Sequence, residues 1–248
     1  MGRKKSYSKY QSNFIELVKN KVAKAINDYK LIDDGDRVLV AISGGKDSLC
    51  LLENLVAYQK FKKVNFQIGI IHINLTDMDY EIDKKLITEF CSKLDLNINF
   101  VNTFANIESR GKKSACFICS RNRRKTMFQY AKDNNFNKIA FGHHMDDAVE
   151  TLIINMIYHA NAASIPASLK MFSGEIEIIR PLILLTNKDT TEFAKIKNYP
   201  PLKKTCPYDD KTMRTTARNI IKSMEVINPN VRPNLLRALK NIDHELIP

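Results

Sequence analysis

Six consecutive polar and glycine residues could hold a phosphate group, because they follow a buried apolar run and precede a helical pattern. They are Ser43, Gly44, Gly45, Lys46, Asp47 and Ser48. The paired glycines let the backbone approach phosphate oxygens, and the N–H groups at the start of the following helix favour an anion. Lys46 adds a positive charge, and Asp47 is placed to hold a magnesium ion. The alternative is a plain strand-to-helix turn; the spacing differs from that of a Walker A loop.

A second polar stretch lies about a hundred residues further on, in the run Gly142-His143-His144-Met145-Asp146-Asp147. It follows a predicted strand, and open α/β sheets bind ligands at the carboxyl ends of their strands. The alternative for Asp146 and Asp147 is an acid-rich helix start, which the helix dipole favours anyway. The two histidines are interpreted as a wall of a nucleotide site, with metal ligation as the alternative.

Three cysteines form a third group of chemically capable residues. Cys116 and Cys119 make a C-x-x-C ahead of a basic run from Arg121 to Lys125, and Cys206 follows 87 residues after Cys119. Three thiolates cannot complete a four-cysteine zinc site, whereas an iron–sulfur cluster tolerates an open position. A persulfide on Cys116 or Cys119, resolved by Cys206, is the other route. The remaining two cysteines, Cys50 and Cys91, fall on apolar helical faces and are predicted to be core residues.

Alternating strand and helix patterns must position these groups, and they predict an α/β fold with a doubly wound parallel sheet. Residues 1–30 are predicted to form a basic segment and a helix, and residues 31–199 the ATP-binding domain with the C-x-x-C. Residues 200–248 are predicted to form a small helical region with the third cysteine. The predicted strands are residues 38–42, 66–73, 98–101, 138–141 and 177–179, and the helices are 14–29, 48–59, 82–94, 119–134 and 146–158.

The overall charge indicates a polyanionic partner. Lys and Arg total 39 against 27 for Asp and Glu, a formal net charge of +12, and the positive residues recur in local runs. We therefore expect a nucleic acid partner, with a merely solvated basic surface as the alternative. No apolar stretch is long enough to span a bilayer, so we expect no membrane association and a cytoplasmic location, where cysteines serve metal or redox chemistry.

Taken together, the loop, the Gly142–Asp147 stretch and the cysteines with Arg121, Arg123 and Arg124 resemble the PP-loop ATP pyrophosphatase superfamily. Within it they are most similar to the tRNA-cytidine 2-sulfurtransferase family, with some likeness to the 2-thiouridine-forming branch. The resemblance implies ATP and Mg²⁺, with the six loop residues, Gly142 and Asp147 around the nucleotide and the Ile73 backbone near adenine. It also implies a [4Fe-4S] cluster held by Cys116, Cys119 and Cys206.

The same resemblance implies ATP-dependent tRNA thiolation. AMP is transferred to the C2 carbonyl oxygen of a pyrimidine, cytidine being favoured, and sulfur then replaces that oxygen. Lys46, Asp47, Arg123 and Asp147 are the implied catalytic residues, and the implied partners are tRNA, a sulfur donor such as a cysteine desulfurase, and a second copy in a homodimer. The alternatives are 2-thiouridine synthesis, persulfide-based transfer, tRNA-Ile lysidine synthetase and a non-catalytic RNA-binding protein.

Overall fold

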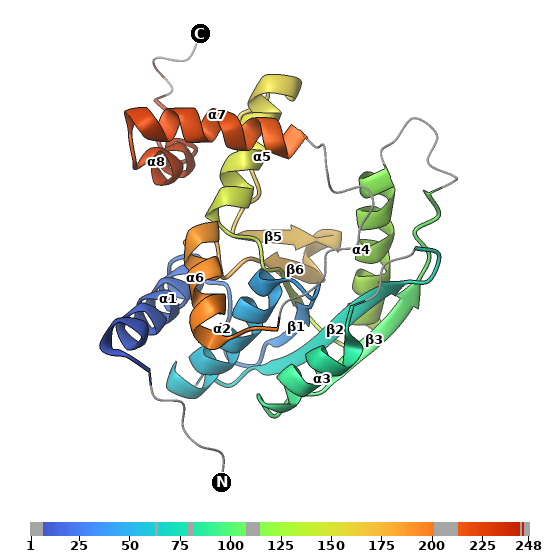
Figure 1. The fold of residues 1–248 in the computed structure, drawn as a ribbon. Coiled ribbons are helices and arrows are strands. Elements are labelled where there is room, and N and C mark those ends of the chain that lie inside the picture. The colour runs from blue at the N-terminus through green and yellow to red at the C-terminus, as the bar shows by residue number, and fades with distance from the viewer. Residues whose placement is uncertain are drawn as a thin grey trace.

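The computed structural model describes residues 7–62, 64–78, 82–107, 115–200, 213–243 and 245. Helices and strands alternate along most of this length (Figure 1). In chain order the elements are α1 (Lys9–Asp28), β1 (Arg37–Ala41), α2 (Lys46–Lys62), β2 (Gln67–Leu75), α3 (Lys84–Ser92), β3 (Ile98–Thr103), α4 (Ala115–Asp133), β4 (Lys138–Ala140), α5 (Met145–His159), β5 (Ser168–Met171), the 3-10 turn η2 (Phe172–Gly174), β6 (Ile176–Ile179), α6 (Asn187–Lys197), α7 (Met213–Ile227) and α8 (Val231–Ala238).

The strands form one six-stranded sheet in the order β3-β2-β1-β4-β6-β5. All neighbouring pairs are parallel except β5 and β6, which are antiparallel. The strand order reverses between β1 and β4, where Val38 lies opposite Lys138. Crevices at such a reversal are where doubly wound sheets bind ligands, and both polar stretches found in the sequence follow these two central strands. The predicted fold class is confirmed.

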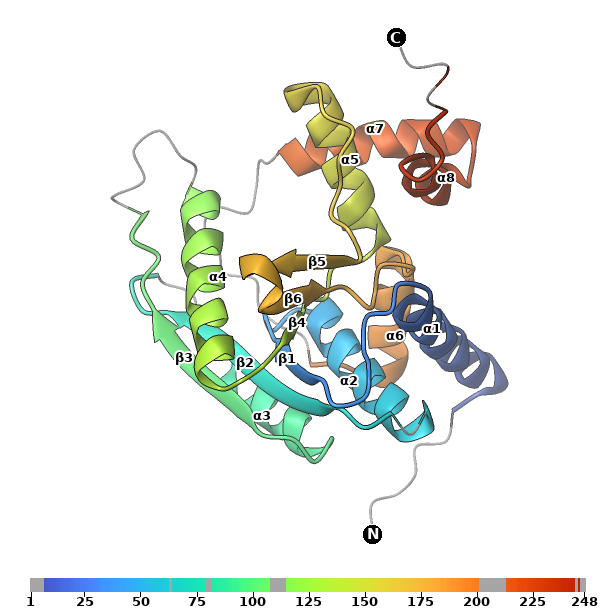
Figure 2. The same ribbon diagram turned by 180° about the vertical axis from the view of Figure 1, so that it is seen from behind.

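Both faces of the sheet are buried, which explains why its central strand is a continuous apolar run. Val38 and Val40 of β1 pack into the main core with α1, α2, α3 and α6, while Leu39 packs on the other face with Met127 and Ala131 of α4. Figure 2 shows α4 on one side of the sheet and α1, α2 and α6 on the other. The alternation of side chains along a strand thus divides the apolar residues between two layers.

A third apolar cluster joins the two C-terminal helices to α5. It contains Val149 and Ile153 of α5, Ala217 and Ile221 of α7, and Val231 of α8. In Figures 1 and 2 these three helices gather beyond one end of the sheet. The division of the chain at about residue 200 stays a prediction.

Most predicted elements are present, with differences at their ends. Helix α1 begins at Lys9 because Ser8 caps it: the Gln11 N–H donates to the Ser8 hydroxyl, and the Gln11 side chain accepts from the Ser8 N–H. Helix α4 begins at Ala115, so that both cysteines of the C-x-x-C are helical. Strand β5 was not predicted from the sequence. Among the described residues, no helix is both long and apolar enough to cross a bilayer.

The ends of the central strands away from the polar loops are held by a buried carboxylate, Asp36. It accepts hydrogen bonds from the Asp33 N–H at 2.7 Å, from Asn137 Nδ2 at 2.7 Å and from Lys138 Nζ at 2.9 Å. Burial raises the pKa of Asp36, but the hydrogen bonds from Asp33, Lys138 and Asn137 outweigh it, so the pKa lies below its ordinary value.

A carboxylate whose pKa is lower in the folded than in the unfolded state stabilises the protein above its ordinary pKa. That contribution is lost as pH falls through the folded-state pKa. We therefore expect Asp36→Asn to lower the free energy of unfolding by about 2 kcal/mol at neutral pH, with a smaller difference from the wild type below about pH 4. Urea unfolding at both pH values measures this. Asp133→Asn, on the exposed end of α4, is the control; an Asp36→Asn deficit that does not change with pH would contradict the assignment.

Candidate nucleotide site

The loop between β1 and α2 is braced by its own side chains. Ser48 is buried beneath it, donates a hydrogen bond to the Gly45 carbonyl oxygen at 2.8 Å and accepts one from the Ser43 N–H at 3.3 Å. Gly44 has φ +86°, a left-handed backbone conformation that residues other than glycine rarely adopt. The turn therefore directs the chain from β1 into α2 and brings the positive end of the α2 dipole to the loop.

Gly142, after β4, lies directly against this loop. A Cβ atom at Gly142 would be 2.9 Å from the Asp47 carbonyl carbon and 3.0 Å from both the Asp47 oxygen and the Ser48 nitrogen. These are backbone atoms, which cannot move aside as a flexible side chain would. Glycine is required at residue 142 because the two connections at the sheet reversal touch.

Helix α5 begins with an acidic turn that faces the loop. His144 is the N-cap residue, and its N–H donates to Asp147 Oδ2 at 3.0 Å, while its Nδ1 lies 3.2 Å from the same oxygen. Its Nε2 lies 3.9 Å from Asp47 Oδ1. Burial raises the pKa of Asp147, but His144, the His144 N–H, His143 and Arg214 lower it by more, so Asp147 is held as a carboxylate.

Arginines from the C-terminal helices pair with three carboxylates in the first two turns of α5. Arg232 Nη1 of α8 lies 2.8 Å from Asp146, and Arg214 Nη1 of α7 lies 3.1 Å from Asp147. Arg218 makes two hydrogen bonds to the buried Glu150, at 2.6 and 3.3 Å. These pairs offset the negative charge of three acidic residues that are close together, and they fix α7 and α8 on the site.

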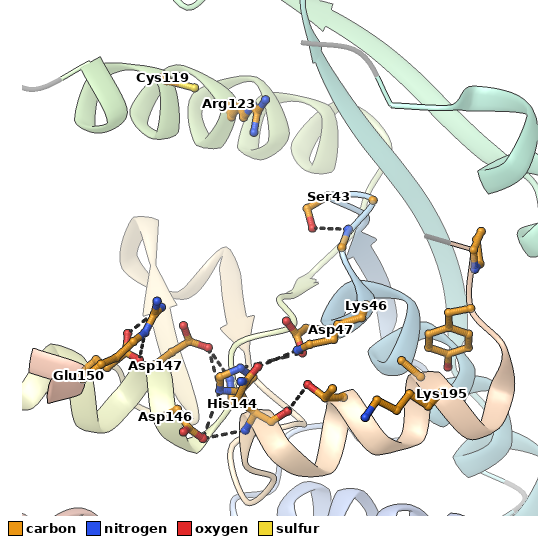
Figure 3. Close-up of a pocket in the computed structure, with 18 of the residues that line it drawn as sticks. Ser43, Lys46, Asp47, Cys119, Arg123, His144, Asp146, Asp147, Glu150 and Lys195 are labelled. Carbon is orange, nitrogen blue, oxygen red and sulfur yellow. Dashed lines mark hydrogen bonds and ion pairs between the residues drawn. The ribbon is translucent and has the colours of Figure 1, made fainter. Parts of the chain in front are cut away.

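The loop, the acidic turn and α4 line one pocket of about 940 Å³. In Figure 3, Cys119 and Arg123 on α4 lie on one side of the loop, and Asp146, Asp147 and Glu150 on α5 lie on the other. Pockets of several hundred cubic ångströms suit ligands of nucleotide size. The predicted site residues that line it are Ser43, Gly44, Gly45, Lys46, Asp47, Cys119, Arg123 and Asp147.

The other predicted site residues lie elsewhere. Ser48 and Gly142 support the loop from behind, as described above. Ile73 is buried among the apolar residues under α4, and Leu75, two residues on, lines the pocket instead. Cys206 lies outside the described residues. The proximity of the Ile73 backbone to adenine stays a prediction.

The pocket residues contributed by α6, α7 and α8 were not predicted from the sequence. Asn187 opens α6, donates its N–H to Asp146 Oδ2 at 2.8 Å and accepts from Lys46 Nζ at 2.8 Å. Arg218 and Arg232 also line the pocket. The four-residue spacing of Arg214 and Arg218 places both on one helical face, the only local signal that could have indicated them.

The paired histidines have different surroundings. Burial, partly opposed by Asp147, lowers the pKa of His143 to about 4, and its ring packs against Phe141. His143 is therefore neutral at physiological pH. Within the described ranges, no three His, Cys, Asp or Glu side chains are gathered as a ready metal site. Magnesium is usually held by one or two carboxylates together with substrate phosphates.

The cysteines divide into accessible and buried thiols. Cys116 is exposed and Cys119 is partly exposed at the start of α4, whereas Cys50 and Cys91 are fully buried in the main core. Burial raises the pKa of Cys91 to about 11 and that of Cys50 further. The thiolate is the reactive form, so the two buried thiols should be inert.

We expect iodoacetamide to modify Cys116 and Cys119 of the reduced, metal-free native protein within minutes. Cys50 and Cys91 should remain unmodified until the protein is unfolded. Peptide mass spectrometry after timed quenching measures the four rates, and the same reaction in denaturant is the control. Rapid modification of Cys50 in the native protein would contradict its place in the core.

The sheet reversal, the braced loop and the facing acidic turn together define an α/β nucleotide-binding protein of the PP-loop type. Residues 13–224 match the family described as "PP-loop domain". The chain belongs to this family and, within it, to the tRNA-cytidine(32) 2-sulfurtransferases.

One such relative, tRNA-cytidine(32) 2-sulfurtransferase 1 of Francisella tularensis subsp. tularensis (strain WY96-3418), is 32% identical over 227 residues, covering 90% of this chain and 84% of the relative. Another, tRNA-cytidine(32) 2-sulfurtransferase 2 of strain FSC 198, is 31% identical over 226 residues, 89% of each chain. Among solved structures, the U34-tRNA thiolase NcsA from Methanococcus maripaludis with its [4Fe-4S] cluster superposes with a TM-score of 0.76. It is 21% identical, and the match covers 96% of this chain and 81% of that one, which shows the shared fold.

Proposed function

We propose that the protein thiolates cytidine 32 of tRNA at C2, in a reaction that consumes ATP. A single observation carries this proposal: the phosphate-type loop and the accessible Cys119 line the same pocket. A thiol has no role in adenylation alone, so its place opposite the loop favours sulfur chemistry on the adenylated atom. The tRNA-cytidine relatives support cytidine as the base.

In the first step, the C2 carbonyl oxygen attacks the α-phosphorus of ATP, an O–P bond forms and pyrophosphate leaves. The loop N–H groups, the α2 N-terminus and Lys46 bind the phosphates, and Asp47 and Asp147 are the residues that would hold magnesium, which would neutralise phosphate charge there. Arg123 of α4 stabilises the negative charge that develops on the α-phosphate. Adenylation is needed because the oxygen of a pyrimidine carbonyl is a poor leaving group.

In the second step, hydrosulfide supplied by a sulfur donor attacks C2. A C–S bond forms, the C–O bond breaks, AMP leaves and the sulfur loses its proton. The acidic turn on one side and α4 on the other hold the base between the nucleotide and the cysteines. The base reaches this pocket only when unstacked, and the exposed Arg121, Arg124 and Lys125 of α4 are placed to bind RNA phosphates.

We further propose that Cys116, Cys119 and Cys206 hold a [4Fe-4S] cluster, whose fourth iron would supply an open position for a sulfur ligand. The donor set fits in kind: two thiols one helical turn apart begin α4, and Cys119 lines the pocket. Cys206 is six residues from the pocket residue Pro200, and six extended residues span at most about 20 Å.

Mass spectrometry of tRNA nucleosides tests the function. Cells lacking the gene should lose 2-thiocytidine, and the wild-type gene, but not an Asp147→Asn variant, should restore it. Unchanged thionucleosides would contradict the proposal, and loss of 2-thiouridine instead would contradict the choice of base. For the cluster, the anaerobically purified protein should contain about four iron atoms per chain. An iron-free protein that still thiolates tRNA would instead favour persulfide transfer.

A further inference from the structure

The ammonium group of Lys46 is held by three acceptors, and two of them come from α6. Lys46 Nζ lies 2.6 Å from Asp47 Oδ1, 2.8 Å from Asn187 Oδ1 and 2.9 Å from Thr190 Oγ1. A lysine ammonium has three N–H donors, so all three are satisfied. Lys46 is thereby held at the junction of the loop and a helix about 140 residues away in the sequence.

The two α6 acceptors are themselves fixed. Thr190 is fully buried, and its hydroxyl donates to the Asn187 carbonyl oxygen at 3.2 Å, which leaves an oxygen lone pair for Lys46. Only the oxygen of the Asn187 amide can accept from an ammonium, so the orientation of that side chain is determined. The Asn187 N–H bonds to Asp146, so the first turn of α6 links the loop to the acidic turn of α5.

The three acceptors of Lys46 differ in charge, and this difference affects how Lys46 can bind a phosphate. Asp47 is an anion that neutralises Lys46, and it is also a proposed magnesium ligand. Asn187 and Thr190 are neutral, so they direct the ammonium without cancelling its charge. If magnesium drew Asp47 away from Lys46, these two acceptors would be the ones that keep the ammonium in place.

We propose that Thr190 and Asn187 are positioning residues, which hold the Lys46 ammonium where it meets the phosphates of ATP. The inference rests on the proposed function only for the identity of this ligand. It predicts that loss of the Thr190 hydroxyl weakens binding of the phosphates and leaves binding of the nucleoside unchanged.

The test compares Thr190→Val, which keeps the side-chain shape and removes the acceptor, with Thr190→Ser, which keeps the acceptor. Calorimetry measures the Kd of the magnesium complex of α,β-methylene-ATP, and competition measures the Kd of adenosine. We expect Thr190→Val to raise the Kd of the ATP analogue about tenfold, because a hydrogen bond to a charged group is lost. The Kd of adenosine should equal that of the wild type. Thr190→Ser should lie within about twofold of the wild type.

Thr126→Val is the matched control. Thr126 is a half-buried threonine of α4, and its hydroxyl donates a hydrogen bond to the Thr103 hydroxyl at 2.9 Å. The variant should bind the analogue normally. The proposal would be overturned if a folded Thr190→Val protein bound the ATP analogue with wild-type affinity. It would also be overturned if the variant lost affinity for adenosine by the same factor as for the analogue. If Thr190→Val does not fold, the test uses Asn187→Ala, because Asn187 is exposed. About threefold weaker binding of the ATP analogue would support the positioning role, and unchanged binding would overturn it. These binding measurements contain no tRNA, so their outcome does not depend on whether the protein thiolates tRNA.

Discussion

Replacing Asp147 with Asn is expected to slow adenylation about 100- to 1,000-fold while leaving the protein folded. The asparagine oxygen can still accept the His144 N–H that caps α5, so the helix start is kept. What is lost is the negative charge, which the surroundings maintain by holding the pKa of Asp147 below its ordinary value. A magnesium ion held beside Asp147 would depend on that charge, so the variant should also require more Mg²⁺ for half-maximal rate.

Single-turnover release of pyrophosphate in the presence of tRNA measures this effect. Asp189→Asn is the matched control, because Asp189 occupies the same third helical position in the capping box of α6, with its pKa also lowered. The two variants should have similar melting temperatures, and only Asp147→Asn should be slow. A rate within fivefold of the wild type at ordinary Mg²⁺ concentrations would exclude Asp147 as a metal ligand.

Replacing Gly142 with Ala is expected to weaken ATP binding about 100-fold. The added methyl group would lie about 3 Å from backbone atoms of Asp47 and Ser48, so the loop or the chain after β4 must shift. Overpacking of this kind costs about 1–3 kcal/mol of stability, and small displacements in a phosphate site cost further binding energy. Calorimetry with the ATP analogue and urea unfolding measure the two effects separately.

Gly174→Ala separates lost stability from lost binding. Gly174 has φ +97° and no atoms near its missing Cβ, so alanine there introduces only backbone strain, of about 1–2 kcal/mol. It lies in the turn between β5 and β6 and is not among the residues that line the pocket. We expect it to bind ATP normally. If both variants lost affinity equally, the Gly142 effect would reflect general destabilisation.

The centre of the fold could be predicted because the physical signals there are strong. The run Val38–Ile42 is apolar throughout since β1 is covered on both faces, and this pattern indicates a parallel sheet. The adjacency of the loop and the Gly142–Asp147 stretch followed from the rule that parallel strands end at one edge. Strand β5 was missed because Ser168–Met171 is a short, half-exposed edge strand without a clear alternation.

The rest of the pocket depends on tertiary contacts that no local pattern encodes. Arg218 could be recognised as basic and helical, but its pairing with Glu150 depends on how α7 crosses α5. Thr190 resembles any helical threonine until α6 is packed beside α2. The side chains that hold a site in place are therefore harder to predict than the sequence motif that indicates the site.

The pairing of β1 with β4 has a consequence for synthesis of the chain. Val38 and Lys138 are register partners separated by a hundred residues, so the ribosome needs about 5–20 s between them. During that interval the phosphate loop exists without Gly142 beside it or α5 facing it. A nascent chain therefore has no nucleotide pocket until Gly142 and α5 have been synthesised, and ATP can stabilise only the later part of folding.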